Sequence, residues 1–300
     1  MFDDYDFALC LTHDVDRVRK TFQGPYYALK QPERRGYHLR TSLPDRNPYW
    51  QFERIMELED DLGVRSSFYF LQERELLREM APKEWLTPRN WMLHRGIYDV
   101  REPAIAEVIR DLDAGGWEVG LHGSYGSYDD RERLAHEKAV LEDVLGHPVR
   151  GIRQHHLNLT EPPTRTWEHH AALGFEYDAS LGSSRTYGFG NGYGPLHPFD
   201  DEFTVFPLTL MEVAMPTPGD EPEAAWAACE SLLHEARDNG AVMTVLWHPR
   251  YFSERDFPGY ADMYRRLIER AQELNAWVGP LEEAYDALAA QPDALALADD

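Results

Sequence analysis

Lysine and cysteine are scarce in this chain. Its 300 residues include only four lysines and two cysteines. Two cysteines cannot build a disulfide framework, and we expect Cys10, in an apolar run, and Cys229, in a helical pattern, to be buried and reduced. Long apolar runs are also missing, since none approaches the ~18 residues of a membrane span. Residues 1–6 are acidic where a secretion signal needs a basic and then an apolar region, so we predict a cytoplasmic protein.

Basic residues are outnumbered in the sequence as a whole. There are 53 Asp and Glu against 30 Lys and Arg, a formal net charge of −23. Long-range repulsion argues against bare nucleic acid and an anionic membrane surface as partners. The 43% share of apolar residues is enough for a core. Many acids with few lysines favour a halophilic protein from a salt-rich cytoplasm, and an ordinary acidic enzyme is the alternative.

Short apolar runs alternate with helical patterns along the chain. We expect seven strands, at residues 7–11, 66–71, 117–121, 149–152, 175–177, 204–206 and 242–247. We expect helices at residues 49–62, 102–114, 130–145, 161–173, 221–239, 260–274 and 281–289. The alternation predicts an α/β fold with parallel strands that are buried on both faces. Because no repeat or linker interrupts it, we expect one domain over residues 1–290 and a flexible acidic tail over residues 291–300.

Two segments interrupt this rhythm. Residues 17–46, the main part of an expected insertion over residues 17–48, contain eight Lys or Arg and two acids, a net +6. The remainder of the chain has 22 basic against 51 acidic residues, a net −29. The second segment, residues 182–194, contains five glycines and predicts a mobile loop.

Asp, His and Arg residues follow five of the predicted strands. Active sites of α/β folds collect at the carboxyl ends of strands, and the two-residue period places Asp14 and Asp16 on the same side. One acidic pair has little weight in so acidic a sequence. Five such strand ends in succession are hard to explain as surface decoration. The candidates are Asp14, Asp16, His122, Arg153, His155, Asp178 and His248.

A divalent metal suits this set of side chains. Zn²⁺ takes His and Asp ligands in hydrolytic sites and brings the pKa of bound water toward ~7. A remaining carboxylate and a remaining histidine can then serve as general base and general acid.

The motifs resemble those of the polysaccharide deacetylases of carbohydrate esterase family 4. The resemblance runs over residues 7–249 and is strongest at T-H-D-V-D (residues 12–16) and at residues 245–249. It implies a distorted (β/α) barrel and metal-dependent hydrolysis of an acetamido group on a sugar. By position, Asp14 resembles the base, Asp16 and His122 metal ligands, and His248 the acid. Arg153 resembles the residue that orients the base, and Asp178 the partner of the acid.

One family feature is absent. The family usually has a second metal-binding histidine four residues after the first, where this sequence has Gly126. We expect His155 to replace it, because it shares a strand face with Arg153, whereas His156 should point away. His197 is the runner-up, and water is a third candidate. T-H-D-V-D and L-H-G-S-Y (residues 121–125) also match a divergent branch of the family, whose substrates the sequence does not name.

Further residues are candidates for substrate binding. Trp247 either forms a wall of the acetyl pocket or belongs to the core. Tyr125 and His197 also follow or flank the predicted motifs. The basic insertion, through Arg34, Arg35 and Arg40, either grips an anionic part of a carbohydrate substrate, such as a phosphate or uronate, or pins itself to the acidic body.

Two other functions fit the same sequence. Relatives of allantoinase share the barrel and tolerate altered ligands, so the chain fits an amidohydrolase acting on a small amide or ureide. A metal-free barrel that only binds glycan is the other alternative, which Gly126 favours. Metal analysis and turnover of both substrate types distinguish these functions from sugar deacetylation.

Overall fold

A single parallel sheet forms the centre of the computed structural model, which describes residues 4–21, 23–43, 46–87, 90–91, 94, 97–199 and 203–290. The strand order is β6-β5-β4-β3-β2-β1-β8-β7, with β9 also paired to β1, and all these pairings are parallel. The strands are β1 (Phe7–Val15), β2 (Ser67–Leu71), β3 (Glu118–Gly123), β4 (Gly151–Gln154), β5 (Tyr177–Asp178), β6 (Thr204–Val205), β7 (Leu208–Met211), β8 (Val242–Leu246) and β9 (Ala276–Gly279). All seven expected strands are present, and β7 and β9 are additional.

The sheet curls into a distorted, open (β/α) barrel, as predicted. Its two edge strands, β6 and β7, are separated in the chain only by Phe206 and Pro207. The chain therefore passes directly from one edge of the sheet to the other, which brings the edges together. Leu208 N–H reinforces this approach by donating to the carbonyl of Leu181 at 2.8 Å.

Strand β1 runs through the middle of the sheet and is buried along its whole length. Residues 8–12 pair with β8, residues 7–10 pair with β9, and residues 12–15 pair with β2. Burial on both faces explains its nearly continuous apolar start. Its carboxyl end carries Asp14 and leads directly to Asp16.

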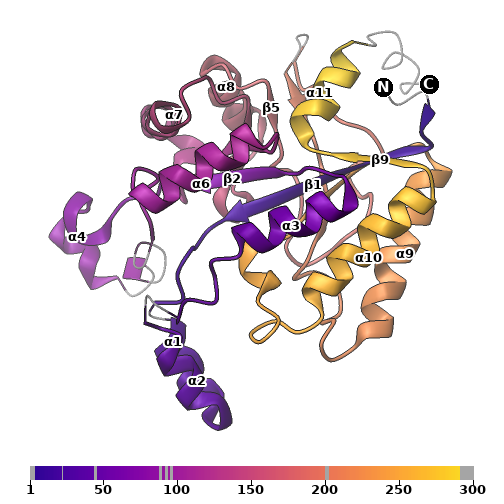
Figure 1. The fold of residues 1–300 in the computed structure, drawn as a ribbon. Coiled ribbons are helices and arrows are strands. Elements are labelled where there is room, and N and C mark those ends of the chain that lie inside the picture. The colour runs from indigo at the N-terminus through magenta and orange to yellow at the C-terminus, as the bar shows by residue number, and fades with distance from the viewer. Residues whose placement is uncertain are drawn as a thin grey trace.

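Helices surround the sheet, as Figure 1 shows for α3, α6, α9 and α10. The long helices match the expected ones: α3 (Phe52–Leu62), α6 (Pro103–Ala114), α7 (Arg131–Leu145), α8 (Thr164–Ala172), α9 (Pro222–Asp238), α10 (Tyr260–Glu273) and α11 (Leu281–Ala289). Local chemistry sets their ends: the Asp130 side chain caps α7 by accepting from Arg133 N–H, and Gly146 follows that helix at φ 91°. No helix of the described ranges is long and apolar enough to cross a membrane.

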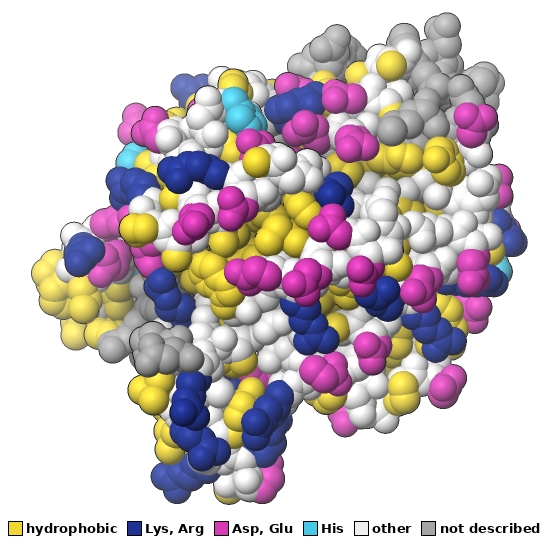
Figure 2. Space-filling view, viewed as in Figure 1, with side chains coloured by type: hydrophobic (Ala, Val, Ile, Leu, Met, Phe, Trp, Pro, Cys, Tyr) yellow, Lys and Arg dark blue, Asp and Glu magenta, His cyan; other side chains and the backbone are white. Residues whose placement is uncertain are grey.

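The basic insertion folds into short helices that the sequence did not predict. α1 (Gln23–Lys30) and α2 (Arg35–Arg40) project from the body, and α4 (Leu76–Glu79) forms a second outlying helix (Figure 1). Figure 2 shows Lys and Arg side chains gathered on the α1–α2 projection, while Asp and Glu are frequent over the rest of that face. The insertion is tied to the body by a buried ion pair, in which Lys20 Nζ lies 2.6 Å from Asp256 Oδ1.

The two cysteines and the end of the chain were the subject of two further expectations. Cys10 and Cys229 are buried and form no disulfide, as expected. Burial raises the pKa of the Cys229 thiol to about 12, which makes it unreactive. The expected acidic tail, residues 291–300, lies outside the described residues.

Candidate metal centre and active site

The carboxyl ends of the parallel strands bring six of the seven predicted side chains together. Asp14, His122 and Arg153 lie near the carboxyl ends of β1, β3 and β4, respectively. His122 and Arg153 are register partners in adjacent strands. Asp16 and His155 follow β1 and β4 directly, and His248 follows β8. Strand direction explains this convergence, because parallel strands end at one edge of the sheet.

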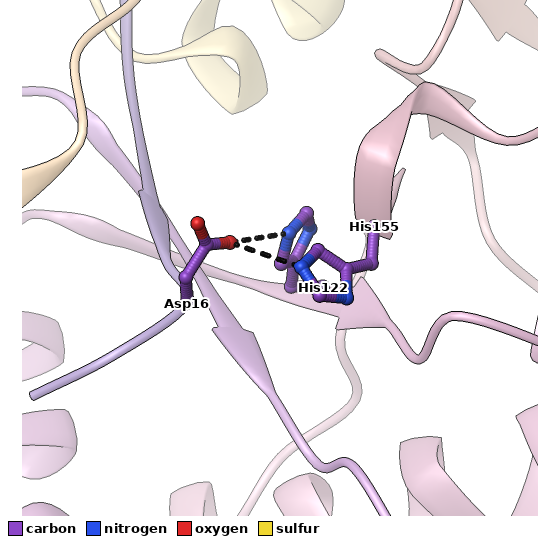
Figure 3. Close-up of side chains that lie close together, drawn as sticks. All are labelled: Asp16, His122 and His155. Atoms are coloured by element: carbon purple, nitrogen blue, oxygen red, sulfur yellow. Dashed lines mark ion pairs between the residues drawn. The ribbon is translucent and has the colours of Figure 1, made fainter. Parts of the chain in front are cut away.

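Asp16, His122 and His155 form a compact triad (Figure 3). Asp16 Oδ1 lies 3.3 Å from His122 Nε2 and 3.6 Å from His155 Nε2. All three potential ligand atoms lie within 4.8 Å of one another. One carboxylate and two imidazoles are a donor set that zinc uses in catalytic sites, where three protein ligands leave a further position open.

The hydrogen bonding of His122 fits a metal ligand. Its Nδ1 donates to the backbone carbonyl of Arg153 at 2.9 Å, which directs Nε2 toward Asp16. His122 Nε2 and Asp16 Oδ1 are both buried and lie 3.3 Å apart. Burial acts to lower the pKa of His122, but Asp14 and Asp16 outweigh it and raise that pKa, so this pair of buried atoms favours a positive charge, either a proton on Nε2 or a metal ion. The residues present therefore fit a divalent metal.

Asp14 is held by a buried arginine beside the triad. Arg153 Nη1 donates to Asp14 Oδ1 at 2.9 Å and to Thr12 Oγ1 at 2.8 Å, while its Nε donates to the Ala179 carbonyl at 2.8 Å. Burial acts to raise the pKa of the Asp14 carboxyl, but Arg153 and the nearby histidines outweigh it and hold that pKa below its usual value. Asp14 is thus an oriented carboxylate, 3.8 Å from His122 Nε2 through its other oxygen.

His248 faces the triad from the opposite strand. Its Nε2 lies 3.3 Å from Asp16 Oδ2, and its Nδ1 lies 2.7 Å from Glu212 Oε1. Burial acts to lower the pKa of His248, but the Glu212 and Asp16 carboxylates outweigh burial and raise it to about 10. The imidazole is therefore protonated at neutral pH and has a proton to donate.

The expected pairing of Asp178 with His248 is wrong. Asp178 is fully buried and bonds to Ser180 Oγ at 2.6 Å and Trp167 Nε1 at 3.2 Å, with His170 Nδ1 also 3.2 Å away. Glu212 holds His248 instead. Glu212 directly follows β7, a strand that the sequence did not reveal, and its N–H donates to Leu246 of β8 at 3.1 Å. Because β7 lies next to β8 and ends beside it, Glu212 is placed next to His248.

His155 reaches the triad from a turn, not from a strand as expected. Strand β4 ends at Gln154, and residues His155–Leu157 form a short 3₁₀ turn. His156 has φ 60°, so the alternation that should point it away does not apply. His156 also lines the cavity, and its ring centroid lies 4.4 Å from that of His155.

Glu73, which the sequence analysis missed, lies behind His155. Its Oε2 lies 3.9 Å from His155 Nδ1 and accepts Tyr125 N–H at 2.8 Å, while Oε1 lies 3.3 Å from His94 Nδ1. Burial acts to raise the pKa of Glu73, but hydrogen bonding to His155, His94 and the backbone of Arg74 lowers it to about 2. Glu73 is therefore a carboxylate that supports His155, one of the three candidate ligands.

The predicted substrate-binding residues lie mostly away from the site. Trp247 is fully buried against Tyr264, with ring centroids 5.5 Å apart, and belongs to the core. Tyr125 approaches His156 with ring centroids 5.5 Å apart, at the rim of the site. His197 is exposed, and so are Arg35 and Arg40, whereas Arg34 is half-buried and lies 3.9 Å from Asp256. None of these residues lines the site cavity.

A cavity of about 440 Å³ opens over the Asp16–His122–His155 triad. Besides Asp14, Asp16, His122, His155 and His248, it is lined by Arg17, Tyr27, Tyr49, Arg250, Tyr251 and Phe257. Arg250 Nη1 donates to Asp16 Oδ2 at 2.9 Å. Arg17 and Arg250 were missed by the sequence analysis, although Arg17 belongs to the basic insertion and Arg250 follows the His248 motif by two residues.

Comparison with known proteins supports the fold assignment. No family model matches the sequence, and no curated protein matches it. The chain is similar in structure to a candidate polysaccharide deacetylase from Mycobacterium smegmatis, with 21% identity and a TM-score of 0.61 over 97% of this chain and 92% of that one. A second candidate polysaccharide deacetylase, from Pseudomonas aeruginosa PAO1, shows 14% identity and a TM-score of 0.61 over the same shares. At these identities the likeness concerns the fold.

Replacing His155 tests whether this residue is the third metal ligand. We expect His155→Ala to weaken zinc binding by about 100-fold or more, because loss of a supporting residue alone costs about 10–100-fold. Zinc affinity is measured by competition with a chromophoric chelator. His197→Ala is the matched control, since His197 is exposed and was the rival ligand. Equal zinc affinities of His155→Ala and the unaltered protein would exclude His155 as a ligand.

Proposed function

We propose that this chain is a metal-dependent hydrolase of the polysaccharide deacetylase type that removes an N-acetyl group from a sugar. The observation that carries the proposal is the Asp16–His122–His155 triad, flanked by an oriented carboxylate and a protonated imidazole. The fold it shares with two candidate polysaccharide deacetylases supports the same conclusion. The reaction class is hydrolysis of a linear amide C–N bond, and the proposed catalytic domain is residues 1–290.

Zn²⁺ is the metal that we propose for the triad. Asp16, His122 and His155 would hold it, leaving a position for water or substrate. When bound, a divalent ion supplies Lewis acidity that polarises a carbonyl oxygen and acidifies water. The hydrogen bond from His122 Nδ1 to the Arg153 carbonyl fixes the ring so that Nε2 is the atom that would bind the metal.

Two side chains carry out the proton transfers. Asp14 accepts the proton of the attacking water, and Arg153 keeps this carboxylate ionised and oriented. His248 donates a proton to the departing sugar nitrogen, because Glu212 keeps its imidazole protonated. Asp14 lies next to His122, which faces Asp16 Oδ1, whereas His248 faces Asp16 Oδ2, so the base and the acid approach the triad at different oxygens of Asp16.

A carbohydrate substrate is consistent with the cavity. Tyr27, Tyr49 and Tyr251 line it, and aromatic rings of this kind suit the apolar faces of sugar rings. The anionic part that the basic insertion suggested is not explained by Arg34, Arg35 or Arg40, which lie outside the cavity.

Metal analysis combined with turnover tests the proposed function. We expect the purified protein, never exposed to chelator, to hold one equivalent of zinc and to release acetate from N-acetylglucosamine oligomers. His122→Ala should lose the zinc and lower turnover by about 100-fold or more. His136→Ala, on the exposed face of α7, should change neither.

Three results would contradict the proposal in different ways. Turnover of allantoin or a small amide, with no acetate from sugars, would indicate an amidohydrolase. A protein that holds no zinc but binds glycan would indicate a binding module. Zinc retained by His122→Ala would show that the triad is not the metal site.

A further inference from the structure

Two arginines form part of the cavity wall next to the triad. Arg17 comes from the start of the basic insertion, and Arg250 from the turn after β8, and both line the cavity with Asp16. Arg250 Nη1 donates to Asp16 Oδ2 at 2.9 Å, while 19% of its side chain stays exposed. Burial lowers the pKa of Arg17, Asp16 raises it and Arg250 lowers it, so these three charges act on one another.

The position of this wall is fixed by the body of the protein. Lys20, three residues after Arg17, pairs with Asp256, six residues after Arg250, and both side chains are buried. This ion pair joins the two segments that carry the arginines. Breaking a buried pair is costly, so the arginines are preorganised with respect to each other.

The charge of the cavity differs in sign from the charge of the whole chain once a divalent ion is bound. With the other histidines counted as neutral, the charged groups of the lining are Asp14, Asp16, Arg17, Arg250 and the protonated His248, and Glu212, which pairs with His248, brings their sum to zero. A divalent ion at the triad brings the cavity to +2, in a chain of −23. Behind the lining, the positive charge of Arg153 next to Asp14 and the negative charge of Glu73 next to His155 offset each other. A positive cavity in so negative a protein attracts an anionic ligand by focusing of the field.

The chemistry of the wall indicates what kind of anion fits. A guanidinium presents several N–H donors in a plane, which matches the oxygens of a carboxylate or a phosphate. The hydrogen bond to Asp16 engages only Nη1 of Arg250. The Arg250 guanidinium lies over the Tyr251 ring, 5.2 Å from its centroid, and this contact holds the guanidinium at the cavity.

We propose that Arg17 and Arg250 form an anion subsite that selects N-acetylated sugars carrying a carboxylate or a phosphate on the same sugar ring. This inference rests on the proposed function for the identity of the sugar. It replaces Arg34, Arg35 and Arg40 as the residues that recognise the anion. In this proposal Arg17, the first residue of the basic insertion, contacts the anion at the cavity, and the arginines of helix α2 do not.

Binding calorimetry tests the subsite without turnover. The protein carries Asp14→Asn to prevent hydrolysis and is titrated, with and without zinc, with N-acetylglucosamine, its anomeric phosphate and N-acetylglucosaminuronic acid. We expect at least one anionic sugar to bind about tenfold or more tightly than the neutral one. Arg17→Gln and Arg250→Gln should each weaken anionic binding by about 10–100-fold and neutral binding by less than about threefold. Arg265→Gln, which removes an exposed arginine of α10, should change neither.

The outcomes separate the subsite from the proposed function. A preference for the phosphate or for the uronate supports the subsite and identifies its anion. Equal weakening of neutral and anionic sugars by Arg250→Gln would show that Arg250 only holds Asp16 and would overturn the proposal, as would equal affinities in the parent protein. Lack of acetate release by the protein with Asp14 intact overturns the proposed function alone, because the anion preference is read from binding.

Discussion

Asp14→Asn should lower kcat for an N-acetylated sugar by about 10²–10⁴-fold, the usual contribution of a general base. Asparagine has nearly the same volume and keeps an oxygen that accepts from Arg153 Nη1, so the local structure should persist. It cannot accept a proton from water at neutral pH. Steady-state kinetics with N-acetylglucosamine oligomers give kcat and KM, and KM should change by less than about threefold, since the lost interaction belongs to the transition state.

The zinc content of Asp14→Asn shows whether activity is lost because a general base is missing or because a metal ligand is missing. Asp14 Oδ2 lies 3.8 Å from His122 Nε2, so Asp14 is near enough to the triad for a ligand role to need exclusion. Zinc retained by Asp14→Asn at one equivalent supports the base, whereas zinc lost together with activity would make Asp14 a ligand. Asp143→Asn, on the exposed side of α7, controls for the loss of one carboxylate.

The strand ends of the site could be predicted from sequence because two rules act together there. Parallel strands end at one edge, and the two-residue period selects which side chains share a face. These rules correctly bring Asp14, His122 and Arg153 to one edge of the sheet, although each strand runs farther than predicted and includes its residue. Both rules stop where a strand stops, and His155 and His156 follow β4 in a turn. His155 was identified although the alternation argument for it does not hold.

The partners of these side chains were less predictable. Glu212 was missed because β7, whose end it follows, was not recognised next to the predicted strand at residues 204–206. Asp178 was then assigned its role, although hydrogen bonds to Trp167 and Ser180 engage it. Glu73 had the same signal as the others, since it follows the predicted strand β2 by two residues. Applying the strand-end rule to every strand would have found it.

The basic insertion shows what composition alone leaves open. Its net charge follows directly from the sequence. The direction in which each arginine points depends instead on helices α1 and α2, and Gly24, Pro25 and Gly36 obscure the helical pattern of these segments. Those helices project outward and carry Arg35 and Arg40 away from the cavity. Arg17 before α1, and Gln23 and Tyr27 within α1, line the cavity, and the ion pair of Lys20 with Asp256 fixes the insertion beside it.

His248→Gln should lower kcat for the acetamide by about 10²–10⁴-fold and leave hydrolysis of an activated ester, such as p-nitrophenyl acetate, nearly unchanged. The amine of a sugar needs a proton to depart, whereas nitrophenolate leaves without one. Parallel kinetics on the two substrates measure this difference. Equal losses on amide and ester would show that His248 does not act as the acid but has another role, such as holding Asp16 at 3.3 Å.

The pH dependence gives the second arm of this prediction. His248 donates only when protonated, and its pKa of about 10 keeps it so at neutral pH, so deacetylation should fall as pH rises through about 10. Glu212→Gln removes the charge that raises this pKa most, so the fall should begin at lower pH, by about one unit or more. Glu57→Gln, an exposed change of equal charge on α3, should leave the profile in place. An alkaline limb that Glu212→Gln does not move would assign it to another group, because no other carboxylate among the described residues lies within hydrogen-bonding distance of His248 Nδ1.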